Sequence, residues 1–197
     1  MNLEDIEYIS KPNFGMDEVV KKFVNTPYPN SKQTFNEINQ IKTIQKMYSL
    51  KKTRIKFCKD VDENLDHVLI DLCNKINVDV PKNILKKTQS IGYLVVKLKQ
   101  HYNRPRPYQF AYYTKQHFNP YETITGNSPS YPSGHSLQTW YLCMNLMVLY
   151  PHKKVQLEKI ATLVSETRIA LGVHYPSDNE FSKQICKYLM ESNNNKI

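Results

Sequence analysis

Apolar residues recur at every third or fourth position along most of the chain, the spacing of amphipathic helices. One clear example runs from Phe35 through Ile38, Ile41 and Ile44 to Met47. The same periodicity predicts helices over 17–25, 35–47, 65–76, 81–103, 133–149, 153–171 and 178–191. Convincing strand alternation and internal repeats are both missing. The sequence therefore predicts an all-α, single-domain bundle of about six to seven helices.

Prolines interrupt this pattern in the middle of the chain. Pro105 and Pro107 cannot continue a helix, so we expect the preceding helix to end near Asn103. The stretch that follows, 104–132, is predicted to be irregular and is rich in Tyr and Phe. Loops of this length in compact domains often carry function.

A chain of 197 residues fits one domain with a substantial core. We assign 1–190 to this domain and expect the polar tail 191–197 to fray. Ser177 and Glu180 have the spacing of a capping box for the last helix. The four cysteines form no CxxC pair, which argues against a zinc knuckle or a redox pair.

The net charge of +9 suits an anionic partner, such as nucleic acid, an acidic membrane or a phosphorylated small molecule. The lysines are scattered, which favours a solvated basic surface, so no nucleic-acid partner is expected. Residues 1–15 lack the apolar stretch of a signal peptide, and the most apolar run, 137–150, is too short to span a bilayer. We therefore expect a cytoplasmic protein with at most peripheral membrane contact. Its oligomeric state is left open.

Three short segments place chemically active residues at predicted helix ends. They read KQHYNRPRP at 99–107, YPSGH at 131–135 and TR-x5-H-x3-D at 167–178. Helix N-termini favour anions, and Arg and Lys side chains match phosphate oxygens. If these ends converge, they surround a single oxyanion with donors. The candidate phosphate-binding residues are Lys99, Arg106, Ser133, Gly134 and Arg168.

Two histidines complete a displacement mechanism, in which one attacks phosphorus and the other protonates the leaving oxygen. Asp178 follows His174 by four residues and can fix the tautomer of that imidazole by accepting a hydrogen bond. His135 has no carboxylate nearby in sequence, which suits a general acid. Each residue alone fits an ordinary cap or surface position, but their joint spacing favours a phosphate site.

The ordered set of segments resembles the signature of the type-2 phosphatidic acid phosphatase (PAP2) superfamily, which also holds bacterial class A acid phosphatases and vanadium haloperoxidases. That signature, K-x6-R-P, P-S-G-H and S-R-x5-H-x3-D, is matched in order from Lys99 to Asp178, with Thr167 in place of Ser. The resemblance is strongest to the class A acid phosphatases. It implies a helical bundle with the active site at helix ends, His174 as the residue that forms a phosphohistidine, and His135 as general acid and then base. It also implies that no metal is required.

Two registers fit the first segment, because Lys97 and Arg104 have the same spacing as Lys99 and Arg106. Lys99 lies nearer the apolar face of its helix, so we favour the Lys99–Arg106 register. After Asp178 the chain reads Asn-Glu-Phe-Ser, where the family often has small residues. This departure bears on how the last helix packs.

The sequence thus predicts a metal-independent hydrolase of phosphoric esters that acts on phosphate monoesters through a phosphohistidine. Phosphorylated small molecules and lipid phosphates, diphosphates included, are the expected partners. No cofactor is expected, and vanadate should inhibit as a mimic of the transition state. The alternative is a vanadate-dependent haloperoxidase on the same scaffold. The physiological substrate and the role of the Tyr-rich loop 108–131 are left open.

Overall fold

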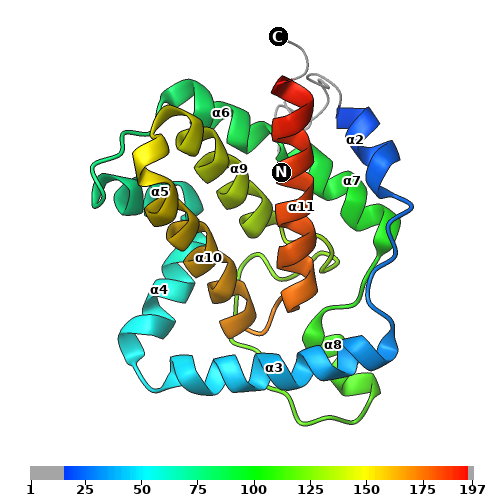
Figure 1. Ribbon diagram of the computed structural model, residues 1–197. Helices are drawn as coiled ribbons and strands as arrows, with labels where there is room; N and C mark the ends of the chain where they lie inside the picture. The colour runs from blue at the N-terminus through cyan, green and yellow to red at the C-terminus, as the bar shows by residue number, and fades with distance from the viewer. Residues whose placement is uncertain (1–15, 195–197) are drawn as a thin grey trace.

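Helix α9 (Gly134–Leu149) lies at the centre of the fold (Figure 1). The computed structural model describes residues 16–194, and all regular elements within this range are helical. Buried side chains occur all around α9, among them Leu137, Leu142 and Leu146, and helices α6, α7, α10 and α11 pack against it. Burial on several sides at once explains why this helix is apolar with little amphipathic pattern. The all-α class is confirmed.

The helices are more numerous than the periodicity predicts, and α3 and α11 extend beyond their predicted ranges. The bounds of the other elements are α2 Met16–Phe23, α3 Ser31–Ser49, α4 Lys52–Glu63, α5 Leu65–Asn74, α6 Lys82–Ser90, α7 Gly92–Tyr102, α8 Pro107–Tyr113, η1 Pro151–Lys153, α10 Lys154–Ala170 and α11 Pro176–Asn194.

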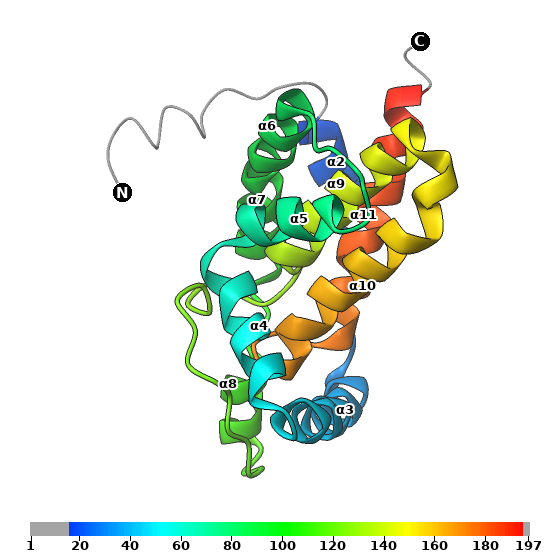
Figure 2. The same ribbon diagram turned by 90° about the vertical axis from the view of Figure 1, so that its left-hand side faces the viewer.

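Helix α3 runs across one end of the bundle formed by α9, α10 and α11, and it is seen nearly end-on in Figure 2. It packs against α4 and α10. Its capping box is complete, since Asn30 Oδ1 accepts from Gln33 N and Gln33 Oε1 accepts from Asn30 N, both at 3.0 Å. The position of α3 matters for the site, because its one acidic residue, Glu37, accepts a hydrogen bond from the backbone in the first turn of α11.

Sequence patterning missed helices α4 and α8 and merged α6 with α7. The segment expected as one helix over 81–103 is divided between Ser90 and Gly92, since Ile91 caps both α6 and α7. Helix α8 lies inside the stretch expected to be irregular. Pro107 is the first residue of this helix. Proline is tolerated there although it has no N–H, because the first backbone N–H of a helix has no intrahelical partner.

The start and the end of α11 also differ from expectation. The predicted capping box is wrong: the helix begins at Pro176, and the Ser177 hydroxyl and N–H both donate to Glu37. A tertiary partner thus replaces the local one, and Glu180 is exposed. The helix continues to Asn194, so 191–194 are helical, and the rest of the predicted tail lies outside the described residues.

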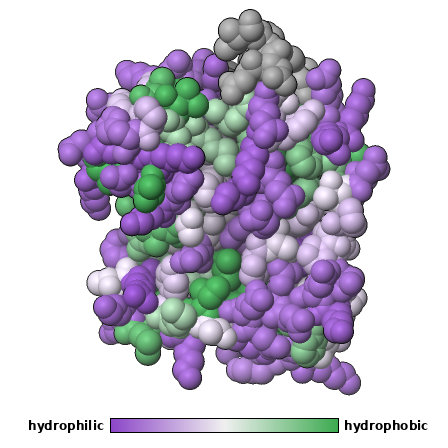
Figure 3. All heavy atoms as spheres, viewed as in Figure 1, coloured by the Kyte–Doolittle hydropathy of each residue, from purple (hydrophilic) through white to green (hydrophobic). Residues whose placement is uncertain are grey.

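The face drawn in Figure 3 is mostly hydrophilic, with small separate apolar patches. The four cysteines, by contrast, are buried free thiols. Burial raises the pKa of Cys58 and of Cys73 to about 11, so both remain protonated at neutral pH.

Candidate active site

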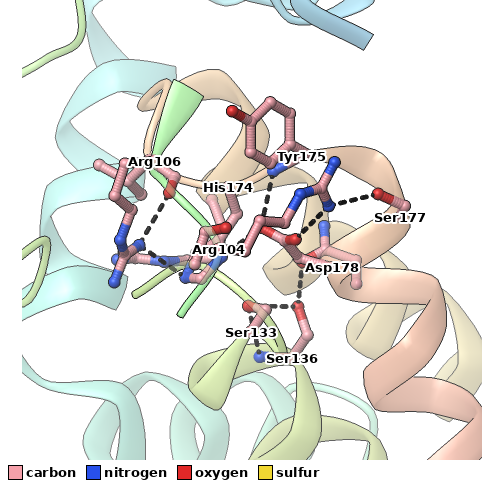
Figure 4. A network of polar contacts seen from close by, with 12 residues as sticks. Arg104, Arg106, Ser133, Ser136, His174, Tyr175, Ser177 and Asp178 are labelled. Carbon is pink, nitrogen blue, oxygen red and sulfur yellow. Dashed lines mark hydrogen bonds and ion pairs between the residues drawn. The ribbon is translucent and has the colours of Figure 1, made fainter. Parts of the chain in front are cut away.

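The predicted site residues lie together where the ends of four helices meet. Lys99 is in the last turn of α7, Ser133 caps α9, Arg168 is in the last turn of α10, and Asp178 is in the first turn of α11. Arg106 lies in the short connection between α7 and α8 and caps α8. Figure 4 shows the polar contacts that connect these elements.

A left-handed turn at Gly172 directs the loop that carries His174 towards this site. Gly172, at φ +75°, ends α10, and a Cβ there would lie 2.9 Å from the Phe118 ring and 3.2 Å from Pro120 Cα. Both the backbone angle and the close approach require glycine. The turn reverses the chain so that His174 N donates to Arg168 O at 3.3 Å.

His174 is buried and has a partner on each ring nitrogen. Nδ1 lies 2.9 Å from Asp178 Oδ2, which also accepts from Tyr175 N at 3.0 Å. Nε2 lies 2.9 Å from Arg106 Nη1, which can only donate. We therefore assign the proton to Nδ1 and the lone pair to Nε2. Burial, with Arg106 and Lys99 adding like charge, keeps the pKa of His174 well below its usual value, so the imidazole is neutral.

Asp178 is fully buried at the base of this histidine. Burial raises the pKa of Asp178 to about 6, and Arg104 is the strongest influence against the rise. Arg104 Nη1 donates to Asp178 Oδ1 at 2.7 Å, so both carboxylate oxygens are occupied. The carboxylate is therefore ionised at neutral pH and holds the Nδ1–H of His174.

Lys99 and Arg106 bring two cations close to the imidazole of His174. Lys99 Nζ donates to Pro129 O, and burial together with Arg106 lowers the pKa of Lys99 to about 7. Arg106 donates to Ser128 O at 2.6 Å and to Val173 O at 2.7 Å. Burial lowers the pKa of Arg106 to about 10, so this side chain stays charged.

Arg168 is completely buried, and only part of its guanidinium group is hydrogen-bonded. Its Nη2 pairs with Asp62 Oδ1 at 2.8 Å and donates to Thr125 Oγ1 at 3.0 Å. Nε and Nη1 have no partner among the described residues. A buried guanidinium with two free donors is costly unless an anion takes them.

The P-S-G-H segment supplies the N-terminus of α9. Ser133 Oγ accepts from Ser136 N at 3.4 Å and caps the helix. A Cβ on Gly134 would come within 3.4 Å of the Val95 side chain. His135 follows on the partly exposed side, and burial, with Arg168 adding like charge, lowers its pKa to about 3. Its imidazole is thus neutral at neutral pH.

The residues after Asp178, where the sequence departs from the family pattern, hold this segment. Asn179 Oδ1 accepts from Ser136 Oγ at 2.6 Å, and Asn179 Nδ2 donates to Ser165 O at 2.8 Å. Ser182 Oγ donates to Ser133 O at 2.9 Å. Polar side chains here tie α11 to α9 and α10 without displacing Asp178.

The two registers of the first segment occupy different environments. Lys97 is exposed, with its Nζ 5.2 Å from the centre of the Tyr93 ring, whereas Lys99 is 7% exposed and faces the site. Arg104 is also buried, but it contacts Asp178 rather than His174.

Sequence reasoning missed two acidic residues of the site, Glu37 on α3 and Asp62 on α4. Glu37 Oε2 accepts from Arg104 Nη2 at 2.9 Å, and Asp62 holds Arg168. Both contacts join residues more than 60 positions apart in the chain, so no spacing rule reveals them. Within residues 16–194, no three His, Cys, Asp or Glu side chains are grouped as metal ligands.

Comparison with known proteins supports these assignments of fold and motif. The PAP2 superfamily model matches residues 88–187. Two curated relatives, the lipid A 1-phosphatases of Rhizobium johnstonii and Rhizobium etli, are 35% and 34% identical over 89 and 87 residues. These alignments cover 44% of this chain but only 35% and 37% of the relatives, so the chain matches a limited part of each.

A solved structure matches nearly the whole chain. It is the transmembrane PAP2-type phosphatidylglycerolphosphate phosphatase of Bacillus subtilis, with a TM-score of 0.54 and 21% identity over 93% of this chain and 96% of that one. This likeness concerns the fold.

The same comparison corrects the predicted location. We expected a cytoplasmic protein because no apolar run is long enough, and none of the helices from Met16 to Asn194 could cross a membrane by length and hydropathy. That inference is wrong, since a transmembrane phosphatase has this fold and the relatives are named for a lipid substrate. The family itself is settled: a model that covers half of the chain, with all three segments at one site, shows that this protein belongs to the PAP2 superfamily.

Proposed function

We propose that this protein is a phosphatase that hydrolyses phosphate monoesters through a phosphohistidine at His174. The observation that carries the proposal is the set of cations around one neutral, oriented imidazole: Lys99, Arg106 and Arg168 converge on His174, and each of them lowers its pKa. Arg168 adds two buried donors that have no partner among the described residues. Such preorganised donors stabilise the charge that develops on a transferring phosphoryl group.

In the first step, the Nε2 lone pair of His174 attacks phosphorus, and the bond from phosphorus to the ester oxygen breaks. His135 gives its proton to the departing oxygen, so an alcohol leaves. In the second step, neutral His135 takes a proton from water, whose oxygen attacks the phosphohistidine and releases phosphate. The first step deprotonates His135 and the second restores its proton, so the cycle closes.

The protonation states suit substrate entry. Before phosphate binds, His135 is neutral at neutral pH, and burial lowers the pKa of Lys99 to about 7. An incoming phosphate brings negative charge beside both, which raises the pKa of each group. Phosphate binding thereby favours protonation of His135, the acid that the leaving group requires. Acidic to neutral conditions favour this uptake of protons.

We further propose lipid phosphates and diphosphates as the substrates. The relatives' names support them, and a cavity of about 320 Å³ lies beside Arg106. Its lining is largely polar, with Gln109, Asn127 and Ser128, and the exposed ring of Tyr113 at its edge. This composition fits a hydroxyl-rich leaving group next to the phosphate. Contact with a membrane surface follows if the leaving group carries acyl chains.

A screen of nucleotides, sugar phosphates, diphosphates and lipid phosphates tests the activity. We expect hydrolysis that survives EDTA, because three side-chain cations supply the charge stabilisation, and that vanadate inhibits as an analogue of the five-coordinate transition state. Loss of activity in EDTA with recovery in zinc or magnesium contradicts the metal-free mechanism. Bromide oxidation by peroxide in the presence of vanadate would instead identify the haloperoxidase alternative, which the relatives' names do not favour.

A further inference from the structure

Arg104 occupies a buried position between two carboxylates, on the opposite side of Asp178 from His174 (Figure 4). Its Nη1 donates to Asp178 Oδ1 and to Ser177 Oγ, both at 2.7 Å. Its Nη2 donates to Glu37 Oε2 at 2.9 Å and to Thr34 Oγ1 at 3.2 Å. The guanidinium thus joins α3 to the first turn of α11.

Aromatic packing fixes this side chain further. The Arg104 guanidinium carbon lies 3.9 Å from the centre of the Tyr175 ring, and only 1% of the side chain is exposed. Glu37 has a second role, since its Oε1 accepts from Ser177 N at 2.7 Å. Glu37 therefore holds both Arg104 and the backbone at the start of α11. Neither residue contacts the imidazole of His174.

We propose that Arg104, anchored by Glu37, is a positioning residue that keeps Asp178 ionised and aimed at His174 Nδ1, so that Nε2 retains its lone pair. The inference rests on the proposed function for its kinetic consequences, but the state of the imidazole can be observed without any substrate. Helix α3 thereby becomes part of the site, although it contains none of the family's motif residues.

The physical reason is the charge balance around a fully buried carboxylate. The ionisable groups that face Asp178 are Lys99 on α7, Arg104 and Arg106 before α8, Tyr131 before α9, His174 and Tyr175 before α11, and Glu37 on α3 through Arg104. Arg104 is the strongest of the cations that keep the proton off Asp178. Without it, two carboxylates remain in one buried network with no shared cation. Burial then drives Asp178 to take a proton, and a protonated carboxyl no longer fixes the Nδ1–H tautomer.

Kinetics of Arg104→Gln test the inference. An opposite charge in direct contact shifts a carboxyl pKa by about 1–3 units, so the acidic limb of the pH–rate profile should move up by that amount. At neutral pH we expect kcat to fall by about 100-fold, the cost of a misplaced catalytic group. Inhibition by inorganic phosphate should keep its wild-type constant, because Arg104 does not touch the phosphate. Lys97→Gln, which removes an exposed cation seven residues earlier, is the matched control and should leave both values unchanged.

Two further variants separate positioning from folding. Arg104→Lys retains the charge, so its acidic limb should stay at the wild-type pH while kcat falls, because one ammonium group lacks the fork that spans both carboxylates. Glu37→Gln/Arg104→Gln removes the second carboxylate charge and should move the limb part of the way back. A loss of rate that is the same at every pH in all three variants, or weakened phosphate inhibition, overturns the inference.

Nitrogen-15 NMR of the histidine side chains gives a readout that needs no turnover. In wild type the His174 signals should report a proton on Nδ1 and a lone pair on Nε2 near pH 7, and Arg104→Gln should shift the ring toward the other tautomer. An unchanged tautomer in Arg104→Gln refutes the positioning role even if the enzyme proves active. The expected tautomer shift in a protein that hydrolyses no phosphate would instead refute the proposed function and leave this inference standing.

Discussion

His174 Nε2 accepts a hydrogen bond from Arg106 Nη1 at 2.9 Å. The atom that attacks phosphorus in our proposal is thus hydrogen-bonded to a cation that we expect to bind the phosphate. A phosphoryl oxygen that takes this donor removes the hydrogen-bond partner of the Nε2 lone pair and brings phosphorus towards it. Phosphate binding therefore also frees the Nε2 lone pair of His174 for attack.

Arg106→Ala should lower kcat/KM by about 100- to 1,000-fold, the usual cost of removing one preorganised donor to a transition-state oxyanion. It should also raise the pKa of His174, because Arg106 is the largest charge that depresses it. Steady-state kinetics measure the first effect, and an NMR titration of the imidazole measures the second. Lys97→Ala serves as the control. A larger loss in that control than in Arg106→Ala would show that the Lys97–Arg104 register is the one that binds phosphate.

The pH dependence of kcat/KM should be bell-shaped, with its maximum between the two pKa values of about 6 for Asp178 and about 7 for Lys99. As pH falls through 6, Asp178 gains a proton and releases the tautomer of His174. As pH rises through 7, Lys99 loses the charge that binds phosphate. In the profile of kcat the alkaline limb should lie at higher pH, because bound phosphate raises the pKa of Lys99. Identical alkaline limbs in the two profiles contradict the role of Lys99.

Asp62→Asn tests how the buried charge of Arg168 is held. Although burial alone raises the pKa of Asp62, the Thr125 hydrogen bond and the charge of Arg168 bring it below its ordinary value. Loss of one partner of a buried ion pair costs about 3–5 kcal/mol, which corresponds to a fall in Tm of about 6–20 °C for a chain of this size. Asp60→Asn on the same helix removes only an exposed pair with Lys56, worth about 0–1 kcal/mol. Equal shifts of Tm in the two variants by calorimetry refute the assignment.

The sequence predicts those parts of the site that depend on local spacing. Ser133 caps α9 as its position before an apolar run suggests, and Asp178, in the first turn of α11, reaches back to His174 in the loop just before that helix. By contrast, Glu37 and Asp62 act across the fold, and amphipathic patterning cannot distinguish a buried acidic side chain from a solvated one.

Prolines and tertiary partners account for most of the errors in secondary structure. Pro107 was interpreted as a helix breaker, yet it starts α8, because proline is unfavourable within a helix and suitable at its first position. Ser177 was expected to cap α11 locally, but it contacts Glu37. The cytoplasmic location failed for a different reason: it rested on an absence, and an absent apolar run specifies neither a fold nor a place in the cell.

The last prediction separates the two histidines. His174→Ala should abolish turnover of every substrate, because it removes the nitrogen to which the phosphoryl group would be transferred. His135→Ala should be selective, since a general acid matters most when the leaving oxygen is a poor leaving group. General acid catalysis is worth about 100- to 10,000-fold, and an aryl phosphate with an acidic phenol barely needs it. His135→Ala should therefore lose far more rate on an alkyl phosphate than on p-nitrophenyl phosphate, while the latter still forms phosphohistidine. Rapid-quench trapping of the phosphoenzyme with both esters measures this difference directly. Equal losses on the two esters, or a phosphoenzyme that persists in His174→Ala, would show that the roles are assigned to the wrong residues.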